Sequence, residues 1–432
     1  MNLGQPRRWR LGVAGIGTVG AGLIKLIAAR GDFAPCGDLA LVTGVSARSK
    51  GAPRGADISS YAWFDDPVAL AKSPDNDIFI ELIGGAEGTA KAAVEAALNA
   101  GKPVVTANKA LIAHHGSALA ALAEAKGAPL LFEAAVMGGT PAVKLLREAL
   151  VGDEIHTVAG ILNGTCNYIL SEMESGGKGF AEVLGQAQTL GYAEADPVMD
   201  IGGFDAAHKI VILAALAFGG GPDWGAAQVE GLGGVDLLDI RLAKDLGYRI
   251  KLAAMAAKSG DGVSVRVHPT LLPLDHPLAK VDGALNALYI EGRHIGRIFI
   301  QGPGAGAGPT AAAVAADIAD VMTGARRPVF QRPAGVLSSL ALPSHEPAFT
   351  KAYVRLIVRD QPGVIASISE TLAECGVSID SFLQKHMEAS GGVPIVLTTH
   401  LAEETVLAEA LSRIGALPTM LSPPRMLRIA HI

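Results

Sequence analysis

The segment RLGVAGIGTVGAGLIKLIAA, residues 10–29, joins a short apolar run to three closely spaced glycines and a second apolar run. Residues 10–14 predict a buried strand, and the residues after the glycines predict a helix. Gly15, Gly17 and Gly20 permit a tight turn, close approach of the backbone to a pyrophosphate, and close packing of the helix on the strand. Because the glycines follow a strand and open a helix, a dinucleotide site is favoured over an ordinary glycine-rich turn.

Strand and helix patterns alternate through the first 145 residues. Further strands are expected at 39–45, 78–84, 103–108 and 129–136, with helices at 66–73, 89–100 and 116–126. Regular alternation is typical of α/β domains with a Rossmann-type, doubly wound parallel sheet. We therefore assign residues 1–145 to a dinucleotide-binding domain, together with 303–325, which contain an amphipathic helix at 309–322.

The pattern changes after residue 145. Residues 146–302 mix long helices with alternating strands, such as 263–269 and 288–292, which predicts an α+β domain for substrate binding and oligomerisation. The helices are expected near 140–150, 165–175, 180–190, 204–218 and 239–257. Residues 326–349 carry four prolines and little periodicity, and are expected to form a linker.

The last part of the chain, residues 350–432, has a pattern of its own. Strands are expected at 353–360, 377–386, 393–401 and 425–430, and helices at 362–376, beginning with Pro362, and 403–415. The order βαββαβ is that of a ferredoxin-like domain.

Composition and charge exclude several classes of protein. The net charge is −6, the sequence pI is near 6.0 and no basic stripe is visible, so no nucleic-acid partner is expected. RRWR and the apolar run after it imitate a signal peptide, but recurrent glycines and Lys25 interrupt that run. No apolar run reaches the roughly 18 residues of a membrane span, so no membrane partner is expected. The three cysteines are widely spaced, which favours the reducing cytoplasm.

The end of the second strand bears on the choice of coenzyme. A site for NAD usually has Asp or Glu there, whereas this chain has Ser46, Arg48, Ser49 and Lys50. Donors and cations at this position would suit the 2′-phosphate of NADP. An ordinary solvated loop explains them nearly as well, so NAD is kept as an alternative.

Two segments carry residues suited to proton transfer. VVTANK ends in Lys109, where a parallel strand would face the ligand crevice, although lysine is most often a surface residue. GYAEADPVMDIGGFDAAHK ends with Asp205 and Lys209 on one side of an apolar helix. Its carboxylates are Glu194, Asp196, Asp200 and Asp205. An exposed pair of this spacing contributes only about 0.2–0.5 kcal/mol, so orienting Lys209 for proton transfer is favoured over a structural salt bridge.

ILNGTCNYIL, residues 161–170, contains Asn163, Gly164 and Thr165, which match a glycosylation sequon. Without a secretory signal that match is coincidental. Thr165 is a candidate N-cap of the helix that follows, so a role in substrate binding needs support from elsewhere.

Five motifs in order resemble those of homoserine dehydrogenases. They are VTANKALIA, FEAAVMGGTPAV, ILNGTCNYIL, GYAEADPVMDIGGFDAAHK and GPGAGAGPTAAAVAADI. The resemblance covers residues 10–325, and RDQPGVIASISETLAECGVSI in the last unit resembles an ACT domain. It implies NAD(P)-dependent interconversion of L-homoserine and L-aspartate 4-semialdehyde, in threonine, methionine and isoleucine biosynthesis.

The resemblance also implies roles for individual residues. Lys209 would exchange the proton of the substrate oxygen, Lys109 would also be catalytic, and Asp205 would orient the lysine. His208 should point to another helix face and take no catalytic part. Substrate-binding residues would be Glu194, for the amino group, with Asp200, Asn163, Gly164 and Thr165. Contacts to the cofactor would come from Gly15, Ile16, Gly17, Thr18, Val19, Gly20, Arg48, Gly84, Thr106, Lys109 and Gly304. A sodium site, built mainly from backbone carbonyls, would involve Glu133, Val136, Gly138 and Thr140.

In the ACT-like unit, Asp360, Gly363 and Val364 would form an amino-acid site at a helix N-terminus, with threonine as the first candidate effector. A homodimer or homotetramer is expected. Two alternatives stay open: an oxidoreductase acting on another small carbonyl or alcohol, and a non-enzymatic regulator that responds to amino acids. The second is disfavoured because such a regulator has no need of Lys109, Glu194, Asp205 and Lys209.

Overall fold

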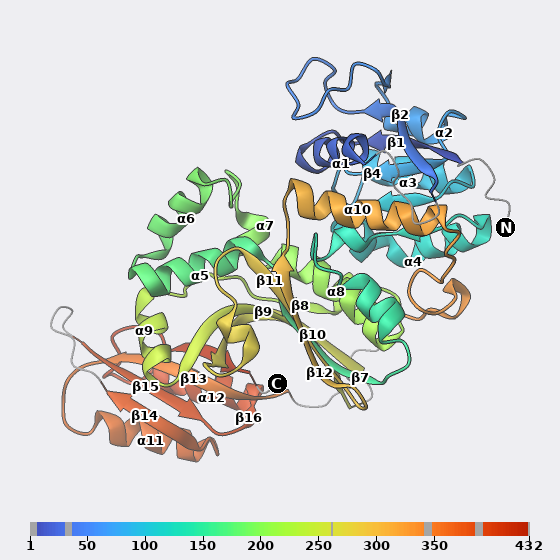
Figure 1. Cartoon of the computed structure of the whole chain (residues 1–432). Helices are drawn as coiled ribbons and strands as arrows, with labels where there is room; N and C mark the ends of the chain where they lie inside the picture. Colours follow the sequence, from blue (N-terminus) through green and yellow to red (C-terminus); the bar gives the residue numbers. More distant parts are fainter. Residues whose placement is uncertain (1–6, 31–36, 261, 341–347, 385–391, 431–432) are drawn as a thin grey trace.

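The computed structural model describes residues 7–30, 37–260, 262–340, 348–384 and 392–430 (Figure 1). The N-terminal sheet is entirely parallel, with the strand order β3-β2-β1-β4-β5-β6. Its strands are β1 (Arg8–Ala14), β2 (Leu39–Ser46), β3 (Ala62–Phe64), β4 (Ile78–Glu81), β5 (Val104–Thr106) and β6 (Leu130–Leu131). The order reverses between β1 and β4, which opens a ligand crevice at their carboxyl ends and confirms the Rossmann-type prediction.

Five helices flank this sheet. They are α1 (Thr18–Ala29), α2 (Pro67–Lys72), α3 (Thr89–Asn99), α4 (Lys109–Lys126) and, from much later in the chain, α10 (Ala307–Met322). Helix α10 lies beside α1 and shares its apolar core, so the chain returns to the first domain after leaving it (Figure 1).

Two predicted boundaries in this domain are wrong. Helix α4 begins at Lys109 rather than near residue 116, because the side chain of Asn108 accepts the N–H of Leu111 and caps the helix. The expected strand 129–136 stops after β6 and continues as the 3₁₀ turn η1 (Glu133–Ala135). The carboxylate of Glu133 accepts the N–H groups of Val143 and Lys144, which folds the chain back at this point.

The substrate domain packs helices on a mixed sheet. Its strands are β7 (Ile155–Ile161), β8 (Ala227–Val229), β9 (Tyr248–Ser259), β10 (Gly262–Pro273), β11 (Leu285–Gly292) and β12 (Gly296–Pro303). Its helices are α5 (Gly164–Gly176), α6 (Phe180–Thr189), α7 (Val198–Ile201), α8 (Phe204–Phe218) and α9 (Leu237–Asp245). The helix expected at 140–150 is shorter in the structure and consists mainly of a π-helical turn, η2 (Leu145–Ala149).

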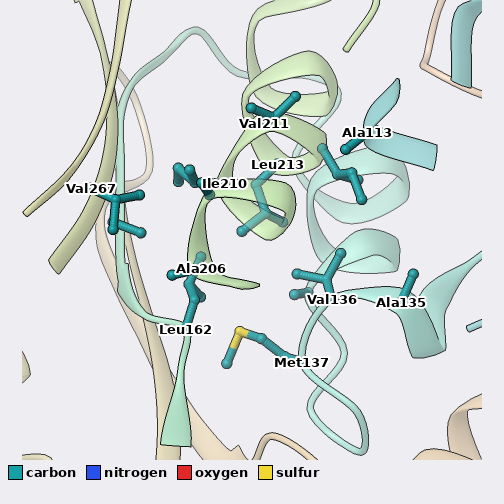
Figure 2. Packing of buried hydrophobic residues seen from close by; sticks show 14 of the residues in the cluster. Ala113, Ala135, Val136, Met137, Leu162, Ala206, Ile210, Val211, Leu213 and Val267 are labelled. Atoms are coloured by element: carbon teal, nitrogen blue, oxygen red, sulfur yellow. The ribbon is translucent and has the colours of Figure 1, made fainter. Parts of the chain in front are cut away.

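Helix α8 forms the centre of the core. Figure 2 shows Ala206 and Ile210 packed near Leu162 and Val267, with Ala113 of α4 and Val136 close by. Apolar side chains cover almost its whole length, so the few polar groups on α8 are held in fixed positions.

The predicted helix 239–257 is wrong in its second half. Helix α9 ends at Asp245, Gly247 turns with a φ of +84°, and β9 pairs with β10 along its full length. The alanines of β9 favour helix by propensity, and pairing with β10 overrides that preference.

The C-terminal unit has the predicted βαββαβ order. It contains β13 (Phe349–Val358), α11 (Val364–Glu374), β14 (Ile379–Gln384), β15 (Val393–Thr399), α12 (Glu404–Gly415) and β17 (Arg425–Ile429), with a short β16 (Ala402–Glu403). Residues 385 and 386 of the predicted third element lie outside the described residues. Strand β17 also pairs with β10, so this unit and the substrate domain share one eleven-stranded sheet.

The segment predicted as a linker is mostly exposed where it is described, but part of it packs on the protein. Phe330 is buried, with its ring centroid 5.5 Å from that of Phe132, and a short turn, η5, spans Ala334–Val336. Among the described residues, no helix is long and apolar enough to cross a membrane.

Candidate active site

A cavity of about 820 Å³ lies where the two larger domains meet. Its walls come from the ends of β5 and α1, from α5, α7 and α8, and from the loop before α10. The predicted site residues that line it are Val19, Lys109, Val136, Asn163, Gly164, Thr165, Asp200, Asp205, Lys209 and Gly304. The structure therefore gathers residues predicted to bind cofactor and substrate around one space.

Asp205 lies between two lysines in this cavity. Its Oδ2 atom accepts a hydrogen bond from Lys209 Nζ at 2.8 Å, and its Oδ1 atom lies 3.0 Å from Lys109 Nζ. Lys209 and Asp205 share the first turns of α8, whereas Lys109 comes from the start of α4 in the other domain. The site is thus assembled across the domain boundary.

The two lysines differ in burial, and their pKa values shift in opposite directions. Burial lowers the pKa of Lys209, and the charge of Asp205 only partly offsets that effect. The charge of Asp205 raises the pKa of Lys109, whose side chain is 39% exposed. Burial opposes ionisation of Asp205, but Lys209 and Lys109 hold the pKa of its carboxyl well below the usual range. Lys209 is therefore the lysine whose proton is held more weakly.

Asn163 connects the acids of the site. Its Oδ1 atom caps α5 by accepting the N–H of Cys166, and its Nδ2 atom donates to Asp200 at 2.8 Å and to Asp205 at 2.9 Å. Asn163, not Thr165, is therefore the N-cap. The hydroxyl of Thr165 donates instead to the carbonyl of Tyr192, at the cavity wall. Burial raises the pKa of Asp200, with the hydrogen bond from Asn163 acting in the opposite direction.

Asn286 is a site residue that reasoning from the sequence did not select. Its Nδ2 atom donates to the carbonyl of Leu162 at 3.0 Å, and that carbonyl also accepts a hydrogen bond from Lys209 Nζ at 2.7 Å. Asn286 lies between apolar residues near the start of strand β11, where neither its spacing nor an adjacent charged residue marks it. Gly304 packs against its side chain and leaves no space for a Cβ atom.

The glycine turn has the shape that a pyrophosphate requires. Gly15 has a φ of +98°, and a Cβ atom there would overlap the backbone of Leu82. A Cβ atom on Gly20 would overlap the carbonyl of Gly15, whereas Gly17, the N-cap of α1, faces open space. The residues present therefore fit a dinucleotide at the N-terminus of α1.

A buried carboxylate supports the adjacent loops. Glu81, at the end of β4, accepts the N–H groups of Ile83 and Gly84 and the hydroxyl of Thr106. Asn108 donates to the carbonyl of Gly85, which joins this loop to the start of α4. Thr106 is fully buried, so in this structure it supports the loop and does not line the cavity.

Several of the predicted site residues do not line the cavity. Glu194 is exposed on the segment between α6 and α7, although its charge contributes to the raised pKa of Lys109. Arg48 is exposed beyond the end of β2. Of the four residues predicted to bind sodium, Val136 lines the cavity, and Thr140 has a buried hydroxyl with no hydrogen-bond partner in the described part of the chain.

A smaller cavity, of about 270 Å³, opens beside the first turn of α11. Asp360, Gly363 and Val364, predicted to bind an amino acid, all line it, and Gln384 lies on its other side. Gly363 is the N-cap of α11 with a φ of +88°, so Pro362 precedes the helix instead of beginning it.

Models of known protein families match almost the whole chain. The homoserine dehydrogenase model matches residues 141–319, the homoserine dehydrogenase NAD-binding domain model matches 15–133, and the ACT domain model matches 352–419. Homoserine dehydrogenase of Pseudomonas aeruginosa is 39% identical over 432 residues, which cover 98% of this chain and 99% of that protein. The chain belongs to the homoserine dehydrogenase family.

Other relatives agree with this assignment. Homoserine dehydrogenase of Neisseria gonorrhoeae is 44% identical over 86% of this chain and 87% of that protein. The crystal structure of a homoserine dehydrogenase from Thiobacillus denitrificans has a TM-score of 0.90 and 39% identity, covering 98% of each chain. A hyperthermophilic archaeal homoserine dehydrogenase in complex with NADPH has a TM-score of 0.64 and 28% identity, over 74% of this chain and 99% of that one.

The comparisons confirm the resemblance found in the motifs, including the ACT domain, and support an oxidoreductase that uses a nicotinamide cofactor. They favour homoserine dehydrogenase over both alternatives raised from the sequence.

Proposed function

We propose that this homoserine dehydrogenase interconverts L-homoserine and L-aspartate 4-semialdehyde with Lys209 as the proton-transfer group and NADP as the preferred coenzyme. The observation that carries the proposal is the placement of Asp205 between Lys209 and Lys109 in a cavity beside the glycine turn. Bound nicotinamide supplies or takes the hydride. The residues of the chain bind the substrate, move the proton and stabilise charge on the substrate oxygen.

Proton transfer is assigned to Lys209 because its lowered pKa brings it closer to the working pH than an ordinary lysine. During reduction of the aldehyde, negative charge develops on the carbonyl oxygen and Lys209 donates a proton to it. During oxidation of the alcohol, neutral Lys209 accepts that proton. Asp205 and the carbonyl of Leu162 hold Nζ in one orientation for both directions.

Lys109 is assigned an electrostatic role. Its raised pKa keeps it charged, and its cation can stabilise the developing oxyanion or bind the substrate carboxylate. Asp200 and Glu194 are the acids proposed for the substrate ammonium. Asp200 already lines the cavity, and Glu194 lies on the neighbouring exposed segment.

NADP is preferred in this proposal because the loop after β2 is cationic. Arg48 and Lys50 are exposed, and Arg54 contacts the carbonyl of Lys50 while its guanidinium lies 5.4 Å from the ring centroid of Trp63. These cations, with Ser49, could contact a 2′-phosphate.

A sodium ion is proposed near the loop that follows η1. The partnerless hydroxyl of Thr140 suits an oxygen-ligating cation, together with backbone carbonyls of Glu133, Val136 and Gly138. The carboxylate of Glu133 is already used by two backbone N–H groups, so only its carbonyl would serve. Such an ion would brace the loop that packs against Gly304.

Threonine is proposed as the effector of the ACT domain. Backbone N–H groups at the start of α11 suit its carboxylate, and the cavity there has the size of a small amino acid. We also propose that the protein forms a homodimer or homotetramer.

The proposed function is tested by following coenzyme reduction with L-homoserine, using NADP⁺ and NAD⁺ in parallel. Turnover is expected with L-homoserine, at a higher kcat/KM with NADP⁺, and much less with other small hydroxy acids. A folded protein that oxidises another hydroxy acid and leaves homoserine unchanged would contradict the proposal.

A further inference from the structure

His208 lies next to the catalytic machinery but outside the substrate cavity. It stands between Asp205 and Lys209 in the sequence of α8, and its buried side chain points toward α4, as the resemblance implied. Helix α4 carries Lys109 at its first position. Because α4 and α8 belong to different domains, His208 contacts the partner domain close to both lysines.

Three rings meet at this place. The Nε2 atom of His208 lies 3.2 Å from the Nε2 atom of His114 in α4. Trp224 stacks on His208 with centroids 4.4 Å apart and planes at 29°, and its centroid is 4.9 Å from that of His114. We call His114, His208 and Trp224 the ring clamp.

The hydrogen bond in the clamp requires the Nε2 atom of one imidazole to be unprotonated, so that it can accept the N–H of the other ring. Burial, and then the charges of His114 and Lys109, lower the pKa of His208 to about 4, with Asp205 opposing and Lys209 adding a small lowering. Burial and His115 lower the pKa of His114, with Glu87 opposing. The clamp therefore persists at neutral pH.

The clamp lies where it can control the lysine pair. Nδ1 of His208 is buried and has no hydrogen-bond partner in the described ranges, so its contact with His114 is the polar bond that fixes the ring. On the cavity side of α4 and α8, Lys109 Nζ lies 3.0 Å from Asp205 Oδ1. A shift of α4 relative to α8 would change both contacts together, and misplacement by about 1 Å can lower a rate about 100-fold.

We propose that the ring clamp holds α4 and α8 in register across the domain boundary and thereby places Lys109 against Asp205, with His208 as a positioning residue for the dehydrogenase reaction. This inference rests on the proposed roles of the two lysines. It assigns a function to three side chains that are not among the residues lining the substrate cavity.

The test compares His208→Leu with His208→Gln, whose side-chain amide can reach the position of Nε2. His208→Leu should lower kcat for homoserine oxidation about tenfold and leave KM for NADP⁺ unchanged. It should also move the alkaline limb of the pH profile to higher pH, because Lys109 lowers the pKa of Lys209 and would no longer be held nearby. His208→Gln should recover most of the rate.

A matched control is His268→Leu. His268 is also a buried histidine with a lowered pKa, but it belongs to β10, where its Nδ1 atom lies 2.8 Å from the hydroxyl of Thr270, and not to α4 or α8. It should lower Tm without shifting the pH profile. Equal kcat losses and equal pH profiles in the two leucine variants would overturn the proposal, as would a glutamine variant no better than leucine. If His208→Leu does not fold, His114→Leu replaces it, since His114 is exposed.

A readout independent of activity separates this inference from the proposed function. The losses of Tm caused by His114→Leu and His208→Leu should be non-additive in the double variant, because the two rings contact each other. Additive losses would overturn the clamp even if homoserine turnover is normal. Non-additive losses without homoserine turnover would retain the clamp and reject the proposed function.

Discussion

At the scale of single residues, Lys209 and Lys109 share one carboxylate but have different environments. Lys209 is buried beside Asp205 and the carbonyl of Leu162, which lowers its pKa. Lys109 reaches the same carboxylate from a half-exposed position, and Asp205 raises its pKa. This difference suggests a division of labour that sequence spacing could not supply.

The pH dependence of homoserine oxidation follows from that difference. Oxidation needs neutral Lys209 as base, and its neutral fraction grows as pH rises through its pKa. Because that pKa is lowered, kcat should rise with pH and level off below the ordinary lysine value of about 10.4. Reduction of the semialdehyde needs protonated Lys209, so its kcat should fall over the same range. Parallel alkaline trends in the two directions would argue against Lys209 as the proton carrier.

How much of the site could be predicted also differs by residue. The spacing of Asp205 and Lys209 on an apolar helix selected both, and the family motifs selected Asn163 and Asp200. Asn286 was missed because one polar residue between apolar neighbours carries no periodic signal. Its partner is a backbone carbonyl, which no sequence pattern marks.

At the scale of secondary structure elements, the glycines at the start of α1 have two different roles: one is needed for packing, and the other leaves space for a ligand. Gly20 must lack a Cβ atom for packing, whereas Gly17 has space around it. Gly20→Ala should lower Tm clearly because its Cβ would overlap the carbonyl of Gly15. Gly17→Ala should keep Tm within a few degrees and weaken NADPH binding at least tenfold, since a methyl group would meet the pyrophosphate.

Thermal melting and NADPH fluorescence titration measure these two effects. Gly185→Ala, in the exposed helix α6 with no atom near its Cβ position, is the control and should be neutral or stabilising by about 0.5–1 kcal/mol. Equal effects of Gly17→Ala and Gly185→Ala on NADPH affinity would argue against a pyrophosphate at this turn.

The predictability of elements follows the strength of their periodic signals. Alternating β and α patterns of the first domain, and the βαββαβ order of the last, were predicted correctly. Two of the larger errors are β9, where alanines favour helix but pairing with β10 decides, and β6, which ends because Glu133 binds the backbone of a later segment. Both causes are long-range contacts, which local patterns do not contain.

At the scale of the whole molecule, the ACT domain is joined to the substrate domain by more than strand pairing. Arg355 of β13 donates to Asp239 at 2.7 Å and to Asp236 at 2.9 Å, the two acids that cap α9. Tyr353 donates to Asp239 as well, at 3.2 Å. These contacts join the ACT domain to α9, which packs against α5 of the candidate active site.

Arg355→Met should therefore destabilise the protein by about 3–5 kcal/mol at neutral pH, because Asp239 is fully buried and would lose its cation. Burial already raises the pKa of Asp239, and loss of Arg355 would raise it further. When the pKa of a carboxyl is higher in the folded than in the unfolded state, the free energy of unfolding falls as pH rises. The stability difference between the wild type and Arg355→Met should therefore grow from pH 5 to pH 8.

Urea denaturation over that pH range measures the Arg355 effect. Arg413→Met is the control, because Arg413 pairs with Glu374 at the surface, where solvent screens the pair and its loss should change stability little. If the loss of unfolding free energy in Arg355→Met is the same at every pH, Asp239 is not the group that the substitution leaves unpaired.

Regulation by threonine is predicted at the same scale. Millimolar threonine should raise Tm and lower the rate, and Asp360→Ala should weaken both effects while the rate without threonine stays near that of the wild type. Calorimetry with threonine, and serine as the comparison ligand, measures the binding. Unchanged rate and Tm with threonine would exclude this effector.

The central claim is that Lys209 carries the proton in a site assembled from two domains, and one comparison tests it most directly. Lys209→Ala and Lys109→Ala are assayed for homoserine oxidation and, separately, for NADPH binding, with the exposed Lys126→Ala as control. Lys209→Ala should lower kcat by at least 100-fold with NADPH affinity nearly unchanged, and Lys109→Ala should lower kcat less and raise KM for homoserine. If Lys209→Ala retains wild-type turnover, or loses NADPH binding and turnover together, the assignment of Lys209 is wrong.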